Sequence, residues 1–172
     1  AWMKDYDTSR YVHYEGAQNR GHDDLPYTDI VSRMYPLVGE LRQMSESRKY
    51  SRPIFMCEYA HAMGNSLGNF KEYWDLIYSK DNLIGGCIWD WIDQGLLTDG
   101  NLFGVAASRT RSVHYWAYGG DAEVREFNDG NFCCNGIINP DRSLKPQYYE
   151  VKYIYQPLLI TVSAPGLYKV ES

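Results

Sequence analysis

One glutamate of this sequence stands where a carboxylate could do chemistry. Glu58 follows the apolar run "PIFMC" (residues 53–57), and Tyr59, His61 and Asn65 come soon after it in place of a solvated turn. Runs that are apolar on both faces are typical of strands buried in a sheet. A carboxylate at the end of such a strand points into a pocket, where it can bind a metal ion or react with a ligand. Glu58 is therefore the first candidate functional residue.

The spacing Glu58-x-x-His61 also occurs in di-iron carboxylate proteins, in which both residues project from one face of a long amphipathic helix. Those sites need two such motifs, whereas this sequence has one, and the apolar run before it predicts a strand. The four cysteines show no CxxC spacing and no histidines at the intervals of zinc sites. The sequence therefore does not predict a metal cluster.

Other predicted strands end with residues of a similar kind. They are residues 10–16 with Glu15, residues 28–36 with Tyr35, and residues 83–91 with Trp89, Asp90 and Trp91. The carboxyl ends of parallel strands open on one common edge, which is where barrel enzymes keep their active sites. We expect these side chains to lie around the same mouth as Glu58.

Helical patterns separate the predicted strands. Residues 37–49 and 66–81 have apolar side chains at helical spacing, so that strand and helix alternate along the chain. Units of about 20 to 30 residues fit the repeats of a (β/α)₈ barrel, although a doubly wound sheet would give the same pattern. The predicted fold class is α/β.

The second half of the sequence is less regular. Residues 95–136 have weak periodicity but many aromatic side chains, which predicts a long functional loop. A last helix is predicted over 145–157, with Pro146 near its start and Pro157 at its end. The following residues alternate like a strand and turn at "APG", which predicts the start of a second, β-rich domain.

Composition excludes some kinds of partner. The 172 residues are 44% hydrophobic and 15% aromatic, and they carry a formal charge of −5 without a run of Lys or Arg. This argues against nucleic acid and against an anionic membrane as partners. No apolar stretch reaches the roughly 20 residues that span a bilayer. The sequence does not distinguish a cytoplasmic from a periplasmic location.

Four motifs carry a resemblance to a known family. "PIFMCEYAHAMGNSLGNFKEYW", "LIGGCIWDWIDQGL", "YGGD" and "FCCNGIINPDRSLKPQYYEVKYIYQP" are similar to the catalytic barrel of bacterial β-galactosidases of glycoside hydrolase family 2. The resemblance covers the chain up to about Pro157. It implies a (β/α)₈ TIM barrel and hydrolysis of terminal β-D-galactose from β-galactosides.

The resemblance implies three catalytic residues. Glu58 corresponds to the family's nucleophile, which forms a covalent glycosyl-enzyme that water hydrolyses with retention of configuration. Tyr35, in "SRMYP", corresponds to the tyrosine that hydrogen-bonds the nucleophile and helps it to depart. His61 corresponds to the histidine that contacts the galactose 6-hydroxyl and stabilises the transition state.

The resemblance also implies binding residues. Trp89 corresponds to the apolar platform under the galactose ring. Phe132 and Asn135, in "FCCNG", match two sodium ligands, a backbone carbonyl and a side-chain oxygen, which suit a hard cation. In the family this sodium ion holds the sugar 6-hydroxyl. The substrate-binding set is therefore Trp89, His61 and Asn135.

One required group is missing. A retaining glycosidase needs a second carboxyl group as acid and base, and in the family it belongs to an Asn-Glu pair that these 172 residues lack. The motifs place the chain at about strands five to eight of the barrel, a fragment expected to be unstable or to associate when alone. We expect residues 1–157 to be the C-terminal half of the barrel and 158–172 to be a linker and first strand of a β-sandwich domain.

The expected function is that of a retaining β-galactosidase in the full-length enzyme, with the isolated chain inactive or nearly so. Other domains of the parent enzyme, including those with the magnesium ligands, are expected partners, and the full-length form is expected to be a homo-oligomer. The clearest departure from the family is residues 98–116. The alternatives are a non-catalytic module that binds sugar weakly or complements a partner, and another family 2 glycosidase such as a β-glucuronidase or β-mannosidase.

Overall fold

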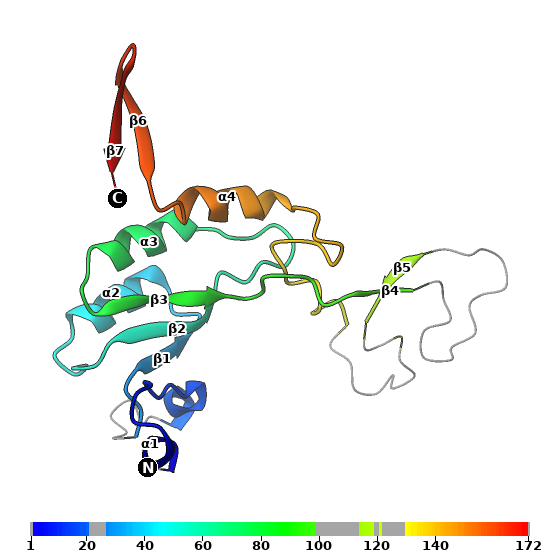
Figure 1. Cartoon of the computed structure of the whole chain (residues 1–172). Coiled ribbons are helices and arrows are strands. Elements are labelled where there is room, and N and C mark those ends of the chain that lie inside the picture. Colours follow the sequence, from blue (N-terminus) through cyan, green and yellow to red (C-terminus); the bar gives the residue numbers. More distant parts are fainter. Residues whose placement is uncertain (1, 21–26, 99–113, 119–120, 122–129, 172) are drawn as a thin grey trace.

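The computed structural model describes residues 2–20, 27–98, 114–118, 121 and 130–171. Its centre is a three-stranded parallel sheet in the order β1-β2-β3. The strands are β1 (Val31–Met34), β2 (Ile54–Tyr59) and β3 (Leu83–Ile88). The helices α2 (Val38–Glu46), α3 (Phe70–Tyr78) and α4 (Pro146–Ile154) lie over one face of this sheet (Figure 1). The predicted alternation of strands and helices is confirmed here.

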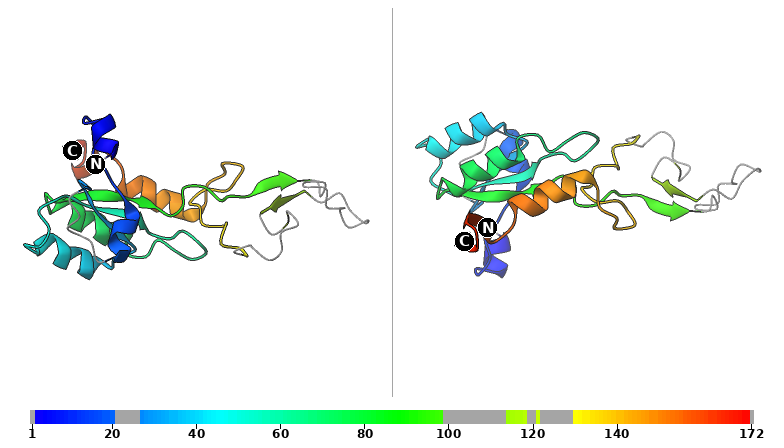
Figure 2. Two further views of the ribbon diagram at one scale, coloured as in Figure 1. Left: turned by 90° about the horizontal axis from the view of Figure 1, so that it is seen from below. Right: turned by 90° about the horizontal axis from the view of Figure 1, so that it is seen from above.

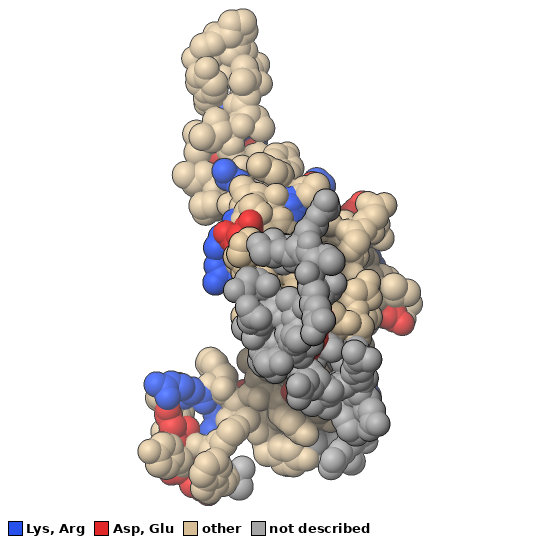
Figure 3. Space-filling model, turned by 90° about the vertical axis from the view of Figure 1, so that its right-hand side faces the viewer, with Lys and Arg blue, Asp and Glu red and all other residues tan. Residues whose placement is uncertain are grey.

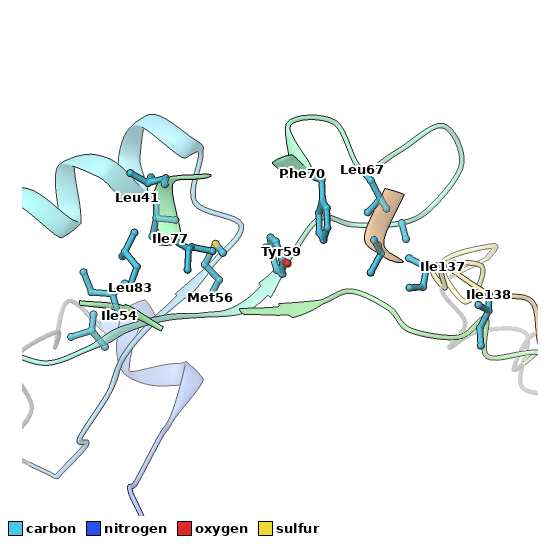
Figure 4. Packing of buried hydrophobic residues seen from close by; sticks show 14 residues of the cluster. Leu41, Ile54, Met56, Tyr59, Leu67, Phe70, Ile77, Leu83, Ile137 and Ile138 are labelled. Atoms are coloured by element: carbon cyan, nitrogen blue, oxygen red, sulfur yellow. The ribbon is translucent and has the colours of Figure 1, made fainter. Parts of the chain in front are cut away.

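The core lies between the sheet and these helices. Leu41, Ile77, Leu83, Ile54 and Met56 form one part of it, and Phe70, Leu67, Ile137 and Ile138 form the other, with Tyr59 between the two parts (Figure 4). Full burial of one large apolar side chain contributes about 1.5 to 3 kcal/mol. This packing fixes the strands from which the candidate functional side chains project.

The predicted strand over residues 10–16 is wrong. Residues 11–14 are irregular, and Glu15 begins a short 3₁₀ helix, η1 (Glu15–Arg20), after the N-terminal helix α1 (Trp2–Tyr6). The reason is local hydrogen bonding: the Val12 amide donates to the Asp29 carboxylate at 2.6 Å, and the Asp29 amide donates to the Val12 carbonyl at 2.8 Å. The Asp29 side chain therefore replaces the backbone ladder that a strand would form here.

A small antiparallel pair extends away from the sheet (Figure 2). It consists of β4 (Leu96–Thr98) and β5 (Tyr115–Ala117), with Leu97 opposite Trp116. The sequence predicted only a loop in this region, since three-residue strands are too short for a visible alternation. Most of the stretch from 98 to 116 lies outside the described residues.

The C-terminal hairpin has no packing partner among the described residues. The strands β6 (Leu159–Ala164) and β7 (Leu167–Glu171) are joined at Pro165 and Gly166, as the sequence predicts, and Gly166 has a φ of +77°. The hairpin projects beyond α4 (Figure 1) and every strand residue in it is exposed. Its surface is mostly uncharged (top of Figure 3). The division into two domains at residue 157 stays a prediction.

The described helices are too short or too polar to cross a membrane. On the face shown in Figure 3, basic and acidic side chains lie close to one another among uncharged ones.

Candidate active site

Backbone bonds bring the carboxyl ends of the three strands together. The Tyr35 amide donates to the Glu58 carbonyl at 2.8 Å, and the Trp89 amide donates to the Tyr59 carbonyl at 2.9 Å. The Ala62 amide then donates to the Trp89 carbonyl at 2.8 Å. Tyr35, Glu58 and Trp89 therefore lie at one edge of the sheet, as expected from parallel strands.

Glu58 and Tyr35 form a side-chain hydrogen bond. Tyr35 has a φ of +50°, in the left-handed region that non-glycine residues rarely adopt. Burial raises the pKa of the Tyr35 phenol well above its usual range, and the hydrogen bond and the negative charge of Glu58 raise it further. A neutral phenol can donate to a carboxylate, so Tyr35 holds Glu58 in one orientation.

The Tyr59 side chain packs in the core between the sheet and the helices and fixes the end of β2. Its side chain is fully buried and stacks on Phe70 with ring centroids 5.7 Å apart. Its hydroxyl lies 2.5 Å from the Tyr155 hydroxyl and accepts a hydrogen bond from Trp74 Nε1 at 2.9 Å. The register of β2 shifts between Met56 and Tyr59, so both of these side chains are buried in the core, and the half-buried Glu58 lies between them at the end of the strand.

His61 lies between two of the predicted site residues. Its ring centroid is 6.0 Å from that of Tyr35 and 5.1 Å from that of Phe132. Its Nε2 atom is buried and finds no hydrogen-bond partner among the described residues. A buried ring nitrogen of this kind costs free energy unless a ligand or water binds it, so His61 has capacity for a polar group.

Asn135 and Phe132 are also in contact. The Asn135 side chain is 1% exposed, and its Nδ2 donates to the Phe132 carbonyl. Its Oδ1 is buried and has no partner among the described residues. Two oxygens, the Asn135 Oδ1 and the Phe132 carbonyl, are thus close in the chain and suit a hard cation by their chemistry. More oxygen ligands than these two are needed to complete such a site.

Two comparisons with known proteins place the chain in a family. A profile described as "Glycosyl hydrolases family 2, TIM barrel domain" matches residues 1–160. The chain belongs to glycosyl hydrolase family 2. It is 43% identical over 174 residues to a protein named beta-galactosidase from Vibrio vulnificus, and 41% identical over 163 residues to one from Lactococcus lactis. These alignments cover 95% and 90% of the chain, respectively, but only 15% of each relative.

The family 2 barrel domain described here is thus a partial TIM barrel, and its three parallel strands with their helices fit that architecture. A third relative named beta-galactosidase, from Pseudoalteromonas haloplanktis, is 42% identical in an alignment that covers 94% of the chain and 15% of the relative. The chain therefore spans about one seventh of the length of the curated relatives it matches.

Asp90 is a site residue that the sequence reasoning placed at a strand end but gave no role. Its negative charge is among the causes of the raised Tyr35 pKa. Its carboxylate accepts hydrogen bonds from the Trp91 amide at 2.6 Å and from Gln94 Nε2 at 2.7 Å. Its own amide donates to the Asn135 carbonyl at 2.7 Å. Asp90 therefore links β3 to the segment that carries Asn135, and the motif "WDW" is the signal that could have shown it.

An ion pair holds this segment in place. Lys145 Nζ lies 2.6 Å from the Asp93 carboxylate, and the two side chains are 18% and 11% exposed. Lys145 also donates to the Gly136 carbonyl at 2.9 Å, and the Gly136 amide donates to Asp93 at 2.7 Å. A Cβ atom at Gly136 would lie 2.1 Å from the Asp93 nitrogen, so no other residue fits there without displacing the backbone. The sequence reasoning missed these three residues because their contact joins positions far apart in the chain.

Beside these residues is a pocket of about 730 Å³. Asn65, Cys134, Lys145, Gln147 and Glu150 are among its lining residues. Glu58 is not among the lining residues, so this pocket does not contain the Glu58 carboxylate.

The di-iron alternative does not fit the fold. Glu58 lies on a strand and His61 in the loop that follows, so the two do not share a helix face. Within the described part of the chain, no three His, Cys, Asp or Glu side chains gather into a metal site. Glu15, at the start of η1, is not at a strand end as predicted, although its charge still acts on His13 and Cys57.

The main chain of Trp89 connects it to the site through hydrogen bonds with Tyr59 and Ala62. Its half-buried indole makes no ring contact within the described residues. Of the six predicted site residues, the other five form a continuous series of contacts: Glu58 to Tyr35, Tyr35 to His61, His61 to Phe132, and Phe132 to Asn135.

Proposed function

We propose that this chain supplies the nucleophile half of the active site of a retaining β-galactosidase, within a longer parent enzyme. The hydrogen bond between Tyr35 and Glu58, at the strand ends of a family 2 barrel domain, is the observation that carries the proposal. The names of the relatives favour a galactoside as substrate.

In this proposal Glu58 attacks the anomeric carbon of the sugar, and the bond to the leaving oxygen breaks as the bond to the carboxylate forms. A second carboxyl group, outside this chain, protonates that oxygen and later activates water, so two inversions give net retention. The Tyr35 hydroxyl donates a hydrogen bond to one oxygen of Glu58, which leaves the other oxygen free to attack. The same hydrogen bond stabilises the carboxylate when it departs from the sugar.

The hydroxyl groups of the sugar are the ligands proposed for the neighbouring residues. His61 Nε2 is free to bind a hydroxyl group, and the Trp89 indole would provide an apolar face for the ring. The unpaired Asn135 Oδ1 and the Phe132 carbonyl would hold a sodium ion, which supplies a positive charge for a sugar oxygen. The proposed magnesium ligands, further domains and homo-oligomeric contacts belong to other parts of the parent enzyme.

The first test is the change Glu58→Gln in the parent enzyme. Loss of a nucleophile removes the covalent step, so we expect kcat for an aryl β-galactoside to fall by about 10⁴-fold or more. Glu72→Gln, a change of an exposed glutamate on α3, is the matched control and should keep normal turnover. Normal turnover by Glu58→Gln would refute the proposal. Faster hydrolysis of an aryl β-glucuronide or β-mannoside than of the galactoside would favour another glycosidase of the family.

A trapping experiment tests whether the 172-residue chain forms the site without the rest of the parent enzyme. A 2-deoxy-2-fluoro-galactoside with a good leaving group should label Glu58 of the parent enzyme, as peptide mapping by mass spectrometry would detect. The same reagent with the 172-residue chain asks whether these strands alone form the site. Absence of a Glu58 adduct on the chain, with an adduct on the parent, would show that the site forms only with the rest of the parent enzyme.

The second prediction concerns Tyr35→Phe in the parent enzyme. Loss of one hydrogen bond aimed at the reacting carboxylate should lower kcat by about 10²-fold to 10³-fold. Since the pKa of Tyr35 lies above its usual value of 10.0, the phenol keeps its proton below pH 10. The alkaline limb of the pH–rate profile below pH 10 should therefore be the same in both proteins. A limb that disappears in Tyr35→Phe would contradict the assigned role of the phenol.

A further inference from the structure

Two adjacent cysteines lie between the proposed sodium ligands. Cys133 and Cys134 follow Phe132 and precede Asn135, and both are free thiols with sulfur atoms 4.0 Å apart. Cys134 is exposed and lines the pocket of about 730 Å³, whereas Cys133 is partly buried, with its sulfur 4.0 Å from the Gly130 carbonyl. One thiol of the pair is therefore accessible from the pocket, and the second lies within reach of the first.

The geometry of neighbouring cysteines decides what such a pair can do. The Cα atoms of consecutive residues are about 3.8 Å apart across a trans peptide. Disulfides prefer Cα separations of about 4.4 to 6.8 Å, so a bond between neighbours strains the backbone. Strained or exposed disulfides are reduced readily, and such bonds are the reversible ones.

We propose that Cys133 and Cys134 form a reversible disulfide site that is closed by a low-molecular-weight disulfide and opened by a thiol. The Cys134 sulfur attacks the small disulfide, forms a mixed disulfide and releases the first thiol. The Cys133 sulfur then attacks the Cys134 sulfur and releases the second thiol. In sum, two protein S–H bonds and one S–S bond are replaced by one protein S–S bond and two small thiols, so two electrons pass from the protein to the reagent.

Closure of this bond would act on the neighbouring residues. The sulfur atoms must approach from 4.0 Å to about 2.05 Å, which requires rotation about the backbone between Cys133 and Cys134. That backbone joins the Phe132 carbonyl to Asn135, whose buried side chain already contacts it. This second part of the inference rests on the proposed function of Phe132 and Asn135. Formation of the disulfide should therefore lower the affinity of the enzyme for sodium.

The chemical part is tested first, on the parent enzyme treated with oxidised glutathione. Peptide mapping without reduction should find the Cys133–Cys134 peptide lighter by about two hydrogen masses, and the mass should return with dithiothreitol. Cys134→Ser should lose this change, whereas Cys87→Ser, at an exposed cysteine on β3, should keep it. Unmodified thiols, or a stable mixed disulfide on Cys134, would overturn the proposal.

The functional part is tested by sodium titration of the galactosidase activity of the same enzyme. Displacement of a ligand should raise the sodium concentration for half-maximal activity by about 10-fold to 100-fold after oxidation, with recovery on reduction. Each cysteine variant is compared with its own reduced form. An unchanged titration of the oxidised enzyme would overturn the coupling to the sodium site. Asn135→Ala, titrated in parallel, separates the two hypotheses, because a sodium response like that of the unchanged protein would refute the sodium site itself.

Discussion

The sheet with its helices and the C-terminal hairpin have equally regular strands but different surroundings. In the sheet, alternate residues of β2 such as Ile54 and Met56 are almost fully buried, whereas every residue of β6 and β7 is exposed. Hydrogen bonds form the strands in both regions. The difference shows what packing adds in the sheet: burial against the helices fixes the strands that carry Tyr35 and Glu58, and the hydrogen bond between these two side chains then orients the carboxylate.

The largest effect should come from a matched pair of aromatic truncations. Phe70→Ala removes a buried ring that stacks on Tyr59, and we expect the free energy of unfolding of the chain to fall by about 3 to 5 kcal/mol. Tyr168→Ala, on the exposed hairpin, should change it by no more than about 0.5 kcal/mol. Urea unfolding followed by circular dichroism measures both. Equal losses would mean that the hairpin is packed as firmly as the sheet.

A smaller loss is expected from Lys145→Met, which leaves the Asp93 carboxylate without its cation. Because the two side chains are 18% and 11% exposed, we expect a loss of about 2 to 3 kcal/mol in the same urea experiment. Lys71→Met removes the Lys71–Asp75 pair, whose side chains are 59% and 61% exposed, and should have a much smaller effect because solvent screens the two charges. A small effect of Lys145→Met would show that backbone hydrogen bonds alone hold the segment with Asn135 and Gly136 beside the end of β3.

The smallest effect should be the pH dependence contributed by His13, whose ring meets Phe55 edge-on at 5.5 Å. Burial lowers the pKa of His13, although the charge of Glu15 acts in the opposite direction. The folded state therefore disfavours the proton, and stability is lost as the pH falls below about 6.5. His13→Gln should flatten the fall of unfolding free energy between about pH 7 and pH 5.

The unchanged protein, measured in parallel, is the control. If the unfolding free energy of His13→Gln has the same pH dependence as that of the unchanged protein, burial does not lower the pKa of His13.

The sequence predicted most of the packed region and little of its internal connections. Apolar runs and helical spacing predicted β1 to β3 and the helices α2, α3 and α4, because burial against a core imposes these periods. The prediction of a strand over 10–16 was wrong because the Asp29 carboxylate takes the Val12 amide, a hydrogen bond that a partner strand would otherwise provide. Tyr35, Glu58 and His61 were found through the motifs and their resemblance to a family. The contacts of Asp93, Gly136 and Lys145 have no local signal, because the residues are 43 and 52 positions apart.

The contacts of Gly136 with Asp93 and Lys145 have a consequence for how this part of the fold can vary. The chain leaves β3 and returns beside it, with the Gln94 amide bonded to the Cys133 carbonyl at 2.9 Å and Ile92 paired with Ile138. The two ends of the intervening segment are thus fastened to each other independently of its length. Insertions, deletions or exchanged loops between these ends can therefore change the intervening segment while Asn135 keeps its position. Loop grafting from relatives should therefore leave the proposed active site intact, provided that Gly136 and its two partners, Asp93 and Lys145, are retained.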